Sequence, residues 1–231
     1  MKKLIIRIIK TKIVNILLHK FLRTKFVQKK RVKRYFANNK EPKLQLGFGN
    51  FPLKGWLNTG IGFWECWNGM YMDAGKPFPL PDNSFDYVFS EHMVEHLTFN
   101  QAQNMLKECY RVMKPGAVMR IATPDLRFLL GLYEDPEKPI HKAYMENSVK
   151  NLGMPPTPAY VISRFHTSWG HQIIYDRKTL TQALTEAGFK DITPCEMSES
   201  KHQALNDVER HFNFHPYEFI HLETMILEAT K

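Results

Sequence analysis

The chain has 231 residues, 43% of them hydrophobic, which is enough to fill the core of one domain of ordinary size. Its three cysteines lie far apart and form no C-x-x-C motif, which excludes a disulfide framework or zinc ribbon and indicates a reducing compartment. The net charge of +9 is uneven, because residues 1–40 hold 14 of the 32 Lys and Arg side chains and no Asp or Glu. We therefore predict a basic helical arm, residues 1–40, on a mildly acidic domain, residues 41–231.

Residues 1–36 have the pattern of a basic amphipathic helix. The side chains that share its apolar face are Ile5, Ile9, Ile13, Ile16 and Leu17. Cations interrupt this face too often for a membrane span or a secretory signal. Three interpretations stay open: residues 1–20 bind an anionic membrane surface, the helix packs on the domain, or the arm binds nucleic acid. The aliphatic stripe of the arm and the acidic domain disfavour nucleic-acid binding. We expect a cytoplasmic protein, which under the first interpretation would lie peripherally at the inner face of the membrane.

Lys43 to Phe48 is a short apolar run that predicts a buried parallel strand. Gly47 and Gly49 at its end allow a sharp turn and let the backbone approach a ligand closely. Pro52 stands where a dinucleotide-binding fingerprint needs its third glycine, and no G-K-[ST] follows, so neither a pyrophosphate loop nor a P-loop is predicted.

The next elements alternate between strands and helices. Met70 to Asp73 predicts a strand ending in an acid, which should point into the crevice where open α/β sheets bind ligands. Phe85 to Ser90 predicts another strand. Thr98 and Gln101 form a capping box for a helix, and Ala117 to Thr123 predicts the following strand.

The second half of the chain is less regular at first. Asp125 is the expected N-cap of a helix whose inner side would carry Leu126, Leu129, Leu130 and Tyr133. Residues 135–175 include the run MPPTP and are interpreted as an acceptor loop or lid. Asp176 should cap the next helix, and strands are predicted at Lys190 to Pro194 and Glu223 to Thr230.

Two runs carry a specific resemblance: PFPLPDNSFDYVFSEHMVEHL with ECYRVMKPGAVMRI, and the later WGHQIIYDRKTLTQALTEAGF. From about Lys43 to the C-terminus the chain resembles the class I S-adenosylmethionine-dependent methyltransferases, in the type-11-like group that includes a bacterial subgroup of predicted methyltransferases. The resemblance implies an α/β fold with a Rossmann-like doubly wound sheet, mostly parallel with an antiparallel last strand.

The resemblance also implies S-adenosylmethionine as cofactor and a set of residues that bind it. The glycine loop Gly47, Phe48 and Gly49 would hold the methionine end. The acid Asp73, with Ala74, would face the adenine. The other side would be lined by the segment that begins with Ser90 and Glu91.

Two departures from the family pattern concern the region after the first strand. The acid that usually ends the second strand and holds the ribose is replaced by Gly60, so Glu65 or a backbone group would have to substitute. Only a short loop separates Gly49 from Trp56, whereas a βαβ crossover needs roughly 10–12 residues or more. We therefore expect the first crossover helix to be missing or reduced to one turn. Residues 22–37 would cover its place through Phe26, Val27, Val32, Tyr35 and Phe36.

Methyl transfer is an in-line displacement that depends mainly on positioning, but an oxygen acceptor must also lose a proton. His92, after a predicted strand end, and His171, after the predicted lid, are the candidate catalytic bases. The acceptor is expected to be a small or glycan-like hydroxyl or acid. A catalytically inactive binding module and a membrane-surface accessory protein are the alternatives.

No metal is predicted. His211 and His215 have the i, i+4 spacing of a helical metal pair, but Pro216 disfavours a helix there. A polar network of Glu209 and His211 beside the acceptor is the preferred interpretation of this segment.

Overall fold

The structure is a computed structural model that describes residues 14–211 and 216–231. Its centre is a seven-stranded sheet in the order β3-β2-β1-β4-β5-β7-β6. The strands are β1 (Lys43–Leu46), β2 (Leu57–Gly60), β3 (Met70–Tyr71), β4 (Phe85–Glu91), β5 (Met113–Pro124), β6 (Lys190–Cys195) and β7 (Thr224–Thr230). β7 runs antiparallel to β5 and β6, whereas the other neighbouring strands are parallel. The predicted doubly wound sheet with an antiparallel last strand is confirmed.

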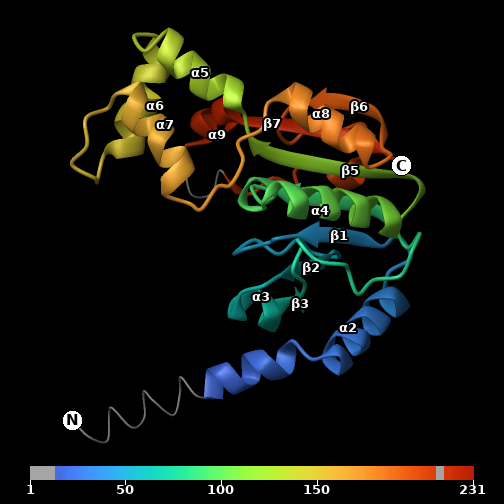
Figure 1. Ribbon diagram of the computed structural model, residues 1–231. Helices are drawn as coiled ribbons and strands as arrows, with labels where there is room; N and C mark the ends of the chain where they lie inside the picture. The colour runs from blue at the N-terminus through green and yellow to red at the C-terminus, as the bar shows by residue number, and fades with distance from the viewer. Residues whose placement is uncertain (1–13, 212–215) are drawn as a thin grey trace, which may run out of the picture.

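The helices lie around this sheet and at one end of it (Figure 1). They are α2 (Lys25–Asn38), α3 (Phe63–Asn68), α4 (Phe99–Val112), α5 (Leu126–Glu134), α6 (Pro139–Val149), α7 (Pro158–Thr167), α8 (Arg177–Glu186) and α9 (Tyr217–Glu223). Residues 14–22 form a further helical segment. No helix among the described residues is long and apolar enough to cross a bilayer.

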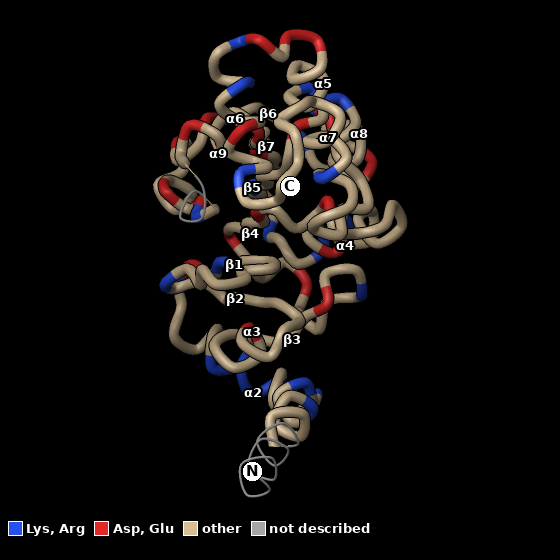
Figure 2. The backbone as a smooth tube through the Cα atoms, turned by 90° about the vertical axis from the view of Figure 1, so that its left-hand side faces the viewer, with Lys and Arg blue, Asp and Glu red and all other residues tan. Residues whose placement is uncertain are grey.

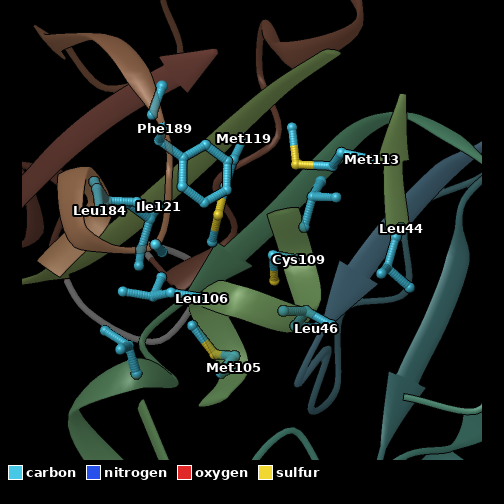
Figure 3. Close-up of a cluster of buried hydrophobic side chains, with 14 of the residues drawn as sticks. Leu44, Leu46, Met105, Leu106, Cys109, Met113, Met119, Ile121, Leu184 and Phe189 are labelled. Atoms are coloured by element: carbon cyan, nitrogen blue, oxygen red, sulfur yellow. The ribbon is translucent and has the colours of Figure 1, made fainter. Parts of the chain in front are cut away.

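One face of the sheet is covered by α4 and α8. The capping box predicted at Thr98 and Gln101 begins α4, and Asp176 caps α8 by accepting a hydrogen bond from the Thr179 backbone N–H. Figure 3 shows how these helices meet β1 and β5 through fully or almost fully buried side chains. These side chains are Leu44, Leu46, Met105, Leu106, Cys109, Met113, Met119, Ile121, Leu184 and Phe189.

The opposite face lacks the first crossover helix, as predicted: residues 47–56, all of them described, contain no helix. A right-handed crossover from β1 to β2 would place its helix on the face opposite to α4. The reason is that the chain crosses the sheet in one direction from β1 to β2 and in the opposite direction from β4 through α4 to β5. That face is covered instead by Leu53 and Trp56 of the short loop and by Leu205 and Val208 from the C-terminal segment.

The prediction that residues 22–37 replace the missing helix is therefore wrong. Val32, Tyr35 and Phe36 of α2 do pack on the sheet, but against the cluster that α4 covers. The Tyr35 hydroxyl donates to the Lys43 carbonyl at 2.8 Å and so fixes α2 to the start of β1. Phe26, expected among the contacts, is 72% exposed. The periodicity defined an apolar side of α2, but it could not specify which face of the sheet lies against that side.

The C-terminal cover is tied to the sheet by Arg120, a fully buried residue of β5. Its guanidinium donates to the carboxylates of Glu209 at 2.5 Å and Glu228 at 2.7 Å. It also donates to the backbone carbonyls of Glu196 and Glu199. Arg120 thereby holds residues 196–209 across the face that the missing helix leaves open. Glu209 is part of this tie and not of a network beside the acceptor, so that interpretation is wrong for Glu209.

A second, smaller core forms at the end of the sheet where the strands finish. α5, α6, α7 and α9 enclose it, so the segment 135–175 contains two helices and not only a loop. Asp125 is the N-cap of α5, as predicted. Leu130 and Tyr133, predicted on its inner side, are 52% and 72% exposed, because Phe128, Leu129 and Leu132 form the buried face instead.

The arm itself is only partly described, and the predicted stripe residues Ile5, Ile9 and Ile13 lie outside the described residues. Ile16 and Leu17 are more than half exposed, so neither packs on the domain. Leu22 is buried, and the Gln28 side chain donates to its carbonyl.

Replacing Arg120 by Met should lower the free energy of unfolding by about 3–5 kcal/mol. The substitution leaves the buried Glu209 and Glu228 carboxylates without their partner, and that cost exceeds the value of the lost ion pairs. Urea denaturation measures the change. The control is Lys114→Met, which removes a half-exposed pair with Asp86 and should cost less than about 1 kcal/mol. Equal effects of the two substitutions would contradict the role given to Arg120.

Phe36→Ala should destabilise the protein by about 1–3 kcal/mol, because the half-buried ring packs on Phe85 with centroids 5.2 Å apart. Phe26→Ala in the same helix removes the same side chain from an exposed position and should stay within about 0.5 kcal/mol. Thermal and urea unfolding of the two variants provide the comparison. A destabilisation by Phe26→Ala as large as that by Phe36→Ala would show that the packing of α2 is misassigned.

Candidate active site

A cavity of about 520 Å³ lies where the glycine loop after β1 and the end of β4 face the helices α6, α7 and α9. Parallel strands place their carboxyl ends at one edge, which is where open α/β sheets bind ligands. The described residues that line it include both predicted bases and much of the predicted cofactor loop: Gly47, Phe48, Gly49, Glu91, His92, His96, Tyr144, Arg164, Trp169, His171, His211 and Glu223.

The glycine loop presents backbone to this cavity. Gly47 has φ +61° and Gly49 has φ +52°, the left-handed region that glycine adopts without strain. A Cβ on Gly47 would lie 2.5 Å from the Met93 Cγ, so the close packing of Met93 requires glycine there. A Cβ on Gly49 would meet nothing within 4 Å, so the backbone at this position is open to a ligand.

Glu65 of α3 occupies the space next to Gly60 at the end of β2. A Cβ on Gly60 would lie 2.0 Å from the Glu65 Oε1, so a side chain at position 60 and this carboxylate exclude one another. The carboxylate accepts hydrogen bonds from the backbone N–H groups of Gly49 at 3.1 Å, Ile61 at 3.1 Å and Gly62 at 2.7 Å. An acid is thus present beside the end of β2, supplied by the following helix and joined to the glycine loop.

The remaining predicted cofactor residues lie at different distances from the cavity. Asp73, Ala74 and Ser90 are outside its described wall. The Asp73 carboxylate accepts from the Gly75 N–H at 3.1 Å and pairs with Lys76 at 3.0 Å. Ser90 is fully buried, and its hydroxyl has no hydrogen-bond partner among the described residues.

Glu91 does line the cavity, but its carboxylate is engaged by the chain above it. Both oxygens accept from the Arg210 backbone N–H, at 2.9 and 3.0 Å, and one accepts from that of His211 at 3.0 Å. Burial raises the pKa of Glu91, although these hydrogen bonds oppose the shift. Glu91 therefore anchors the segment that carries His211 over the cavity.

His92 has the strongest set of contacts. Its backbone has φ +44°, which is uncommon for a residue other than glycine and turns the chain at the end of β4. Its Nδ1 lies 3.4 Å from the Glu95 Oε1, and its Nε2 lies 3.2 Å from the Thr224 hydroxyl. Glu95 is fully buried, and its other carboxylate oxygen accepts a hydrogen bond from the Thr123 hydroxyl. Glu95 thus fixes the orientation of the imidazole.

The pKa of His92 results from opposing effects. Burial alone would lower it, but the contact with Glu95 and the charges of Glu95, Glu223 and Glu91 outweigh burial, so the pKa is raised. The pKa of Glu95 is lowered in turn: burial would raise it, and the pairing with His92 prevails. The two shifts agree that the ionised forms of His92 and Glu95 stabilise one another.

His171 reaches the cavity from the other side. The Glu95 backbone carbonyl accepts from the N–H groups of Gln172 at 2.7 Å and Ile173 at 3.2 Å, which holds the segment after α7 against the end of β4. The His171 ring meets that of His96 at a centroid distance of 4.7 Å. Burial lowers the pKa of His171. Both predicted bases therefore face one cavity, and Glu95 connects them.

The sequence analysis missed several residues of this wall. Tyr144 donates its hydroxyl proton to Glu223, whose pKa is raised by burial. Arg164 donates to the Ser148 carbonyl and lies over the Trp169 ring, 4.9 Å from its centroid. Tyr144 and Arg164 belong to α6 and α7, where the apolar periodicity is weak, and Glu223 was predicted only as the start of the last strand. No local signal in the sequence marks them.

Two groups of side chains have metal-ligand chemistry: His92 with His211 and Glu223, and Glu95 with His96 and His171. The His92 and His211 rings are stacked, 4.1 Å apart and 23° from parallel. Imidazole lone pairs lie in the ring plane, so stacked rings direct them side by side and not at a common ion. In the second group the Glu95 carboxylate already serves His92 and Thr123. In the first group the Glu223 carboxylate accepts from the Tyr144 hydroxyl. His215, the other half of the predicted spacing, lies outside the described residues.

Comparison with known proteins finds similar methyltransferases. Residues 68–121 match the family described as "Methyltransferase domain". A probable S-adenosylmethionine-dependent methyltransferase of Mycolicibacterium smegmatis is 40% identical over 63 residues, 27% of this chain and 24% of that protein. The ubiquinone/menaquinone biosynthesis C-methyltransferase UbiE of Neisseria gonorrhoeae is 30% identical over 131 residues, 54% of this chain and 47% of that protein. The chain thus spans less than half the length of either relative.

Solved structures resemble the chain over a greater length. One is a SAM-dependent methyltransferase from Archaeoglobus fulgidus, with a TM-score of 0.47, 19% sequence identity and 94% of each chain covered. The family match includes β3, β4, α4 and most of β5, which are the elements that carried the resemblance in the sequence. The family match and these relatives support a class I S-adenosylmethionine-dependent methyltransferase of the type-11 group.

Proposed function

We propose that this chain transfers a methyl group from S-adenosylmethionine to a small acceptor bound in the cavity, with His92 as the base. One observation carries the proposal: a single cavity joins the open backbone of Gly49 to an imidazole that a buried carboxylate orients. A volume of about 520 Å³ is in the range of small-molecule sites. The cofactor would supply an electrophilic methyl on a sulfonium, and the chain would supply position and proton transfer.

The residues present fit the cofactor. The open backbone at Gly49 would receive its methionine end. Asp73, which lies outside the described wall of the cavity, would face the adenine, as the family resemblance implies. Glu65 is our candidate for the ribose hydroxyls in place of the acid missing at Gly60. One of its oxygens accepts only the Gly49 N–H and keeps capacity for a further donor. Ser90 and Glu91 would then act from β4, Glu91 through the segment that it anchors.

The acceptor side of the cavity suits a molecule with an acidic or hydroxyl group. Arg164 is the only Lys or Arg among the described residues of the wall, and it lies beside the aromatic ring of Trp169. A guanidinium next to an apolar ring can hold an anionic group on a partly apolar molecule. A hydroxyl or carboxylic acid on a small molecule, or on a glycan-like one, meets this description.

His92 and Glu95 provide the proton transfer. An acceptor hydroxyl becomes a strong nucleophile only as its proton leaves. His92 would take that proton on Nε2, which would exchange its present contact with the Thr224 hydroxyl for one with the acceptor. The imidazolium that results is stabilised by Glu95, whose carboxylate stays ionised. His171, with a lowered pKa, stays neutral at neutral pH and is the second candidate base.

Carbon is the second candidate for the methylated atom, because the relative from N. gonorrhoeae is named as a C-methyltransferase. Methylation of a ring carbon beside a hydroxyl also begins with loss of a proton, so the same base would serve. Acceptors screened with isotope-labelled S-adenosylmethionine and analysed by NMR would distinguish an O-methyl from a C-methyl product.

Gly49→Val should abolish binding of S-adenosylhomocysteine in isothermal titration, because a β-branched side chain would fill the open space and resist the positive φ. Asp73→Ala and Glu65→Gln should each weaken binding by about 1–3 kcal/mol, the value of a hydrogen bond to a charged group. Wild-type protein that gives no thermal shift at millimolar S-adenosylmethionine would refute the methyltransferase proposal and favour the binding-module alternative. Gly153→Ala, also at positive φ but outside the wall, controls for backbone strain.

The rate of methyl transfer should depend on pH through His92. A base must be neutral to accept a proton, so a raised pKa places the acidic limb of the kcat profile above about pH 6.5. Glu95→Gln removes the charge that raises this pKa, and the limb should therefore move to lower pH, with a rate at the plateau lower by roughly 10²-fold. His92→Ala should remove the limb and leave cofactor affinity within a few-fold. If the limb persists in His92→Ala and disappears in His171→Ala, His171 is the base.

A further inference from the structure

A group of exposed apolar side chains lies on and around α3, outside the described wall of the candidate site. Trp64 and Trp67 are both 54% exposed on this six-residue helix, and Ile61, before it, is 60% exposed. Leu17 and Phe21 of the helical segment 14–22 are exposed to a similar extent. We call the five residues Leu17, Phe21, Ile61, Trp64 and Trp67 the apolar patch. Five such side chains exposed within two short segments mark an interaction surface.

Specific contacts hold the two segments together. The His19 ring packs edge-on against Phe63 at 6.0 Å, and its Nε2 lies 3.2 Å from the Ile61 carbonyl oxygen. Arg23 lies over the Tyr71 ring, 4.3 Å from its centroid. Arg31 donates to the Cys66 carbonyl at 2.5 Å and to that of Trp67 at 3.5 Å. The arm and α3 therefore form one continuous surface.

This surface is strongly basic. Residues 1–40 contain 14 Lys or Arg and no acid, and Figure 2 shows the cationic side of the molecule around α2, beside α3. Exposed cations near the apolar patch are Lys20, Arg23, Lys25, Lys29, Lys30 and Lys33. A protein partner can match either the apolar patch or the exposed cations. A bilayer with anionic headgroups matches both, because the cations stay at the headgroups and the apolar side chains enter below them.

Tryptophan is typical of the membrane–water interface, where its ring is apolar on one side and its N–H stays hydrated. Aromatic and basic residues also bind single-stranded nucleic acid, but by stacking bases on rings. The aliphatic members Leu17 and Ile61, with exposed Val14 and Ile16 beside them, contribute nothing to stacking and would be buried in lipid. The observations therefore favour lipid over nucleic acid.

We propose that the apolar patch and the cations of α2 bind the protein peripherally to an anionic phospholipid surface, with α3 and residues 14–22 inserted at the headgroup level. The attachment is independent of methyl transfer and does not rest on it. It assigns to α3 a second role besides placing Glu65, and it makes the arm one of two membrane contacts and not the whole of the interaction.

The test is flotation of the full chain with vesicles of equal parts phosphatidylcholine and phosphatidylglycerol, and with phosphatidylcholine alone. Wild type should bind the anionic vesicles and bind neutral ones much more weakly. Trp64→Ala with Trp67→Ala should weaken binding at least about tenfold. Each of Lys25→Ala and Lys29→Ala should weaken it about fivefold, and the loss should shrink at high salt. The matched control is Leu130→Ala with Tyr133→Ala, which removes two equally exposed apolar side chains from α5 and should bind as wild type.

Four results would overturn the proposal. Wild type that fails to float with anionic vesicles, or a double Trp variant that floats as well as wild type, would exclude a lipid-binding role for α3. A wild-type dimer in size-exclusion chromatography that the Trp substitutions convert to a monomer would assign the patch to a second copy of the chain. Trp-dependent binding of single-stranded RNA without vesicle binding would assign it to nucleic acid. Unchanged melting temperatures of the variants show that only the surface has been altered.

Discussion

The buried guanidinium of Arg120 is the interaction on which both the fold and the candidate site depend. A class I sheet normally has a helix over the β1–β2 flank, and this chain has only a short loop there. Arg120 compensates by holding the segment after β6 through the Glu209 carboxylate and two backbone carbonyls. Isolated buried charge is costly, but here four donated hydrogen bonds to fixed acceptors offset desolvation. The same tie fixes Glu209 and thereby the residues that follow it, whose N–H groups cap Glu91.

The geometry of the candidate site follows from that placement. With the backbone of Arg210 and His211 bound to Glu91, the His211 ring stacks on His92 in the wall of the cavity. Glu95 organises the other side, because its carboxylate faces His92 while its backbone carbonyl holds the segment that carries His171. One buried acid thus sets the protonation of one histidine and the position of another. Short-range interactions at the end of β4 therefore bring together residues separated by more than a hundred positions in the sequence.

The sequence predicted what local physics determines. Capping side chains, glycine at strand ends and alternating apolar runs gave the strands, α4, α8 and the glycine loop, and loop length alone excluded the first crossover helix. Prediction from the sequence failed where the position of a side chain depended on partners distant in the chain. The pattern of α2 defined an apolar side but not its target, Leu130 and Tyr133 were assigned to the wrong side of α5, and the partnership of Glu209 with Arg120, 89 positions away, has no local signature. His92 was identified from its place after a strand, whereas the carboxylate that orients it was not.

The connection between β2 and α3 is short. Only Ile61 and Gly62 separate the end of β2 at Gly60 from the first residue of α3, Phe63. Position 60 is glycine because the Glu65 carboxylate occupies the space that a side chain at position 60 would fill. A helix that turns its Glu inward at this point turns Trp64 and Trp67 outward, because neighbours in a helix point about 100° apart. The acid beside the glycine loop and the exposed tryptophans are thus two results of one arrangement of this six-residue helix.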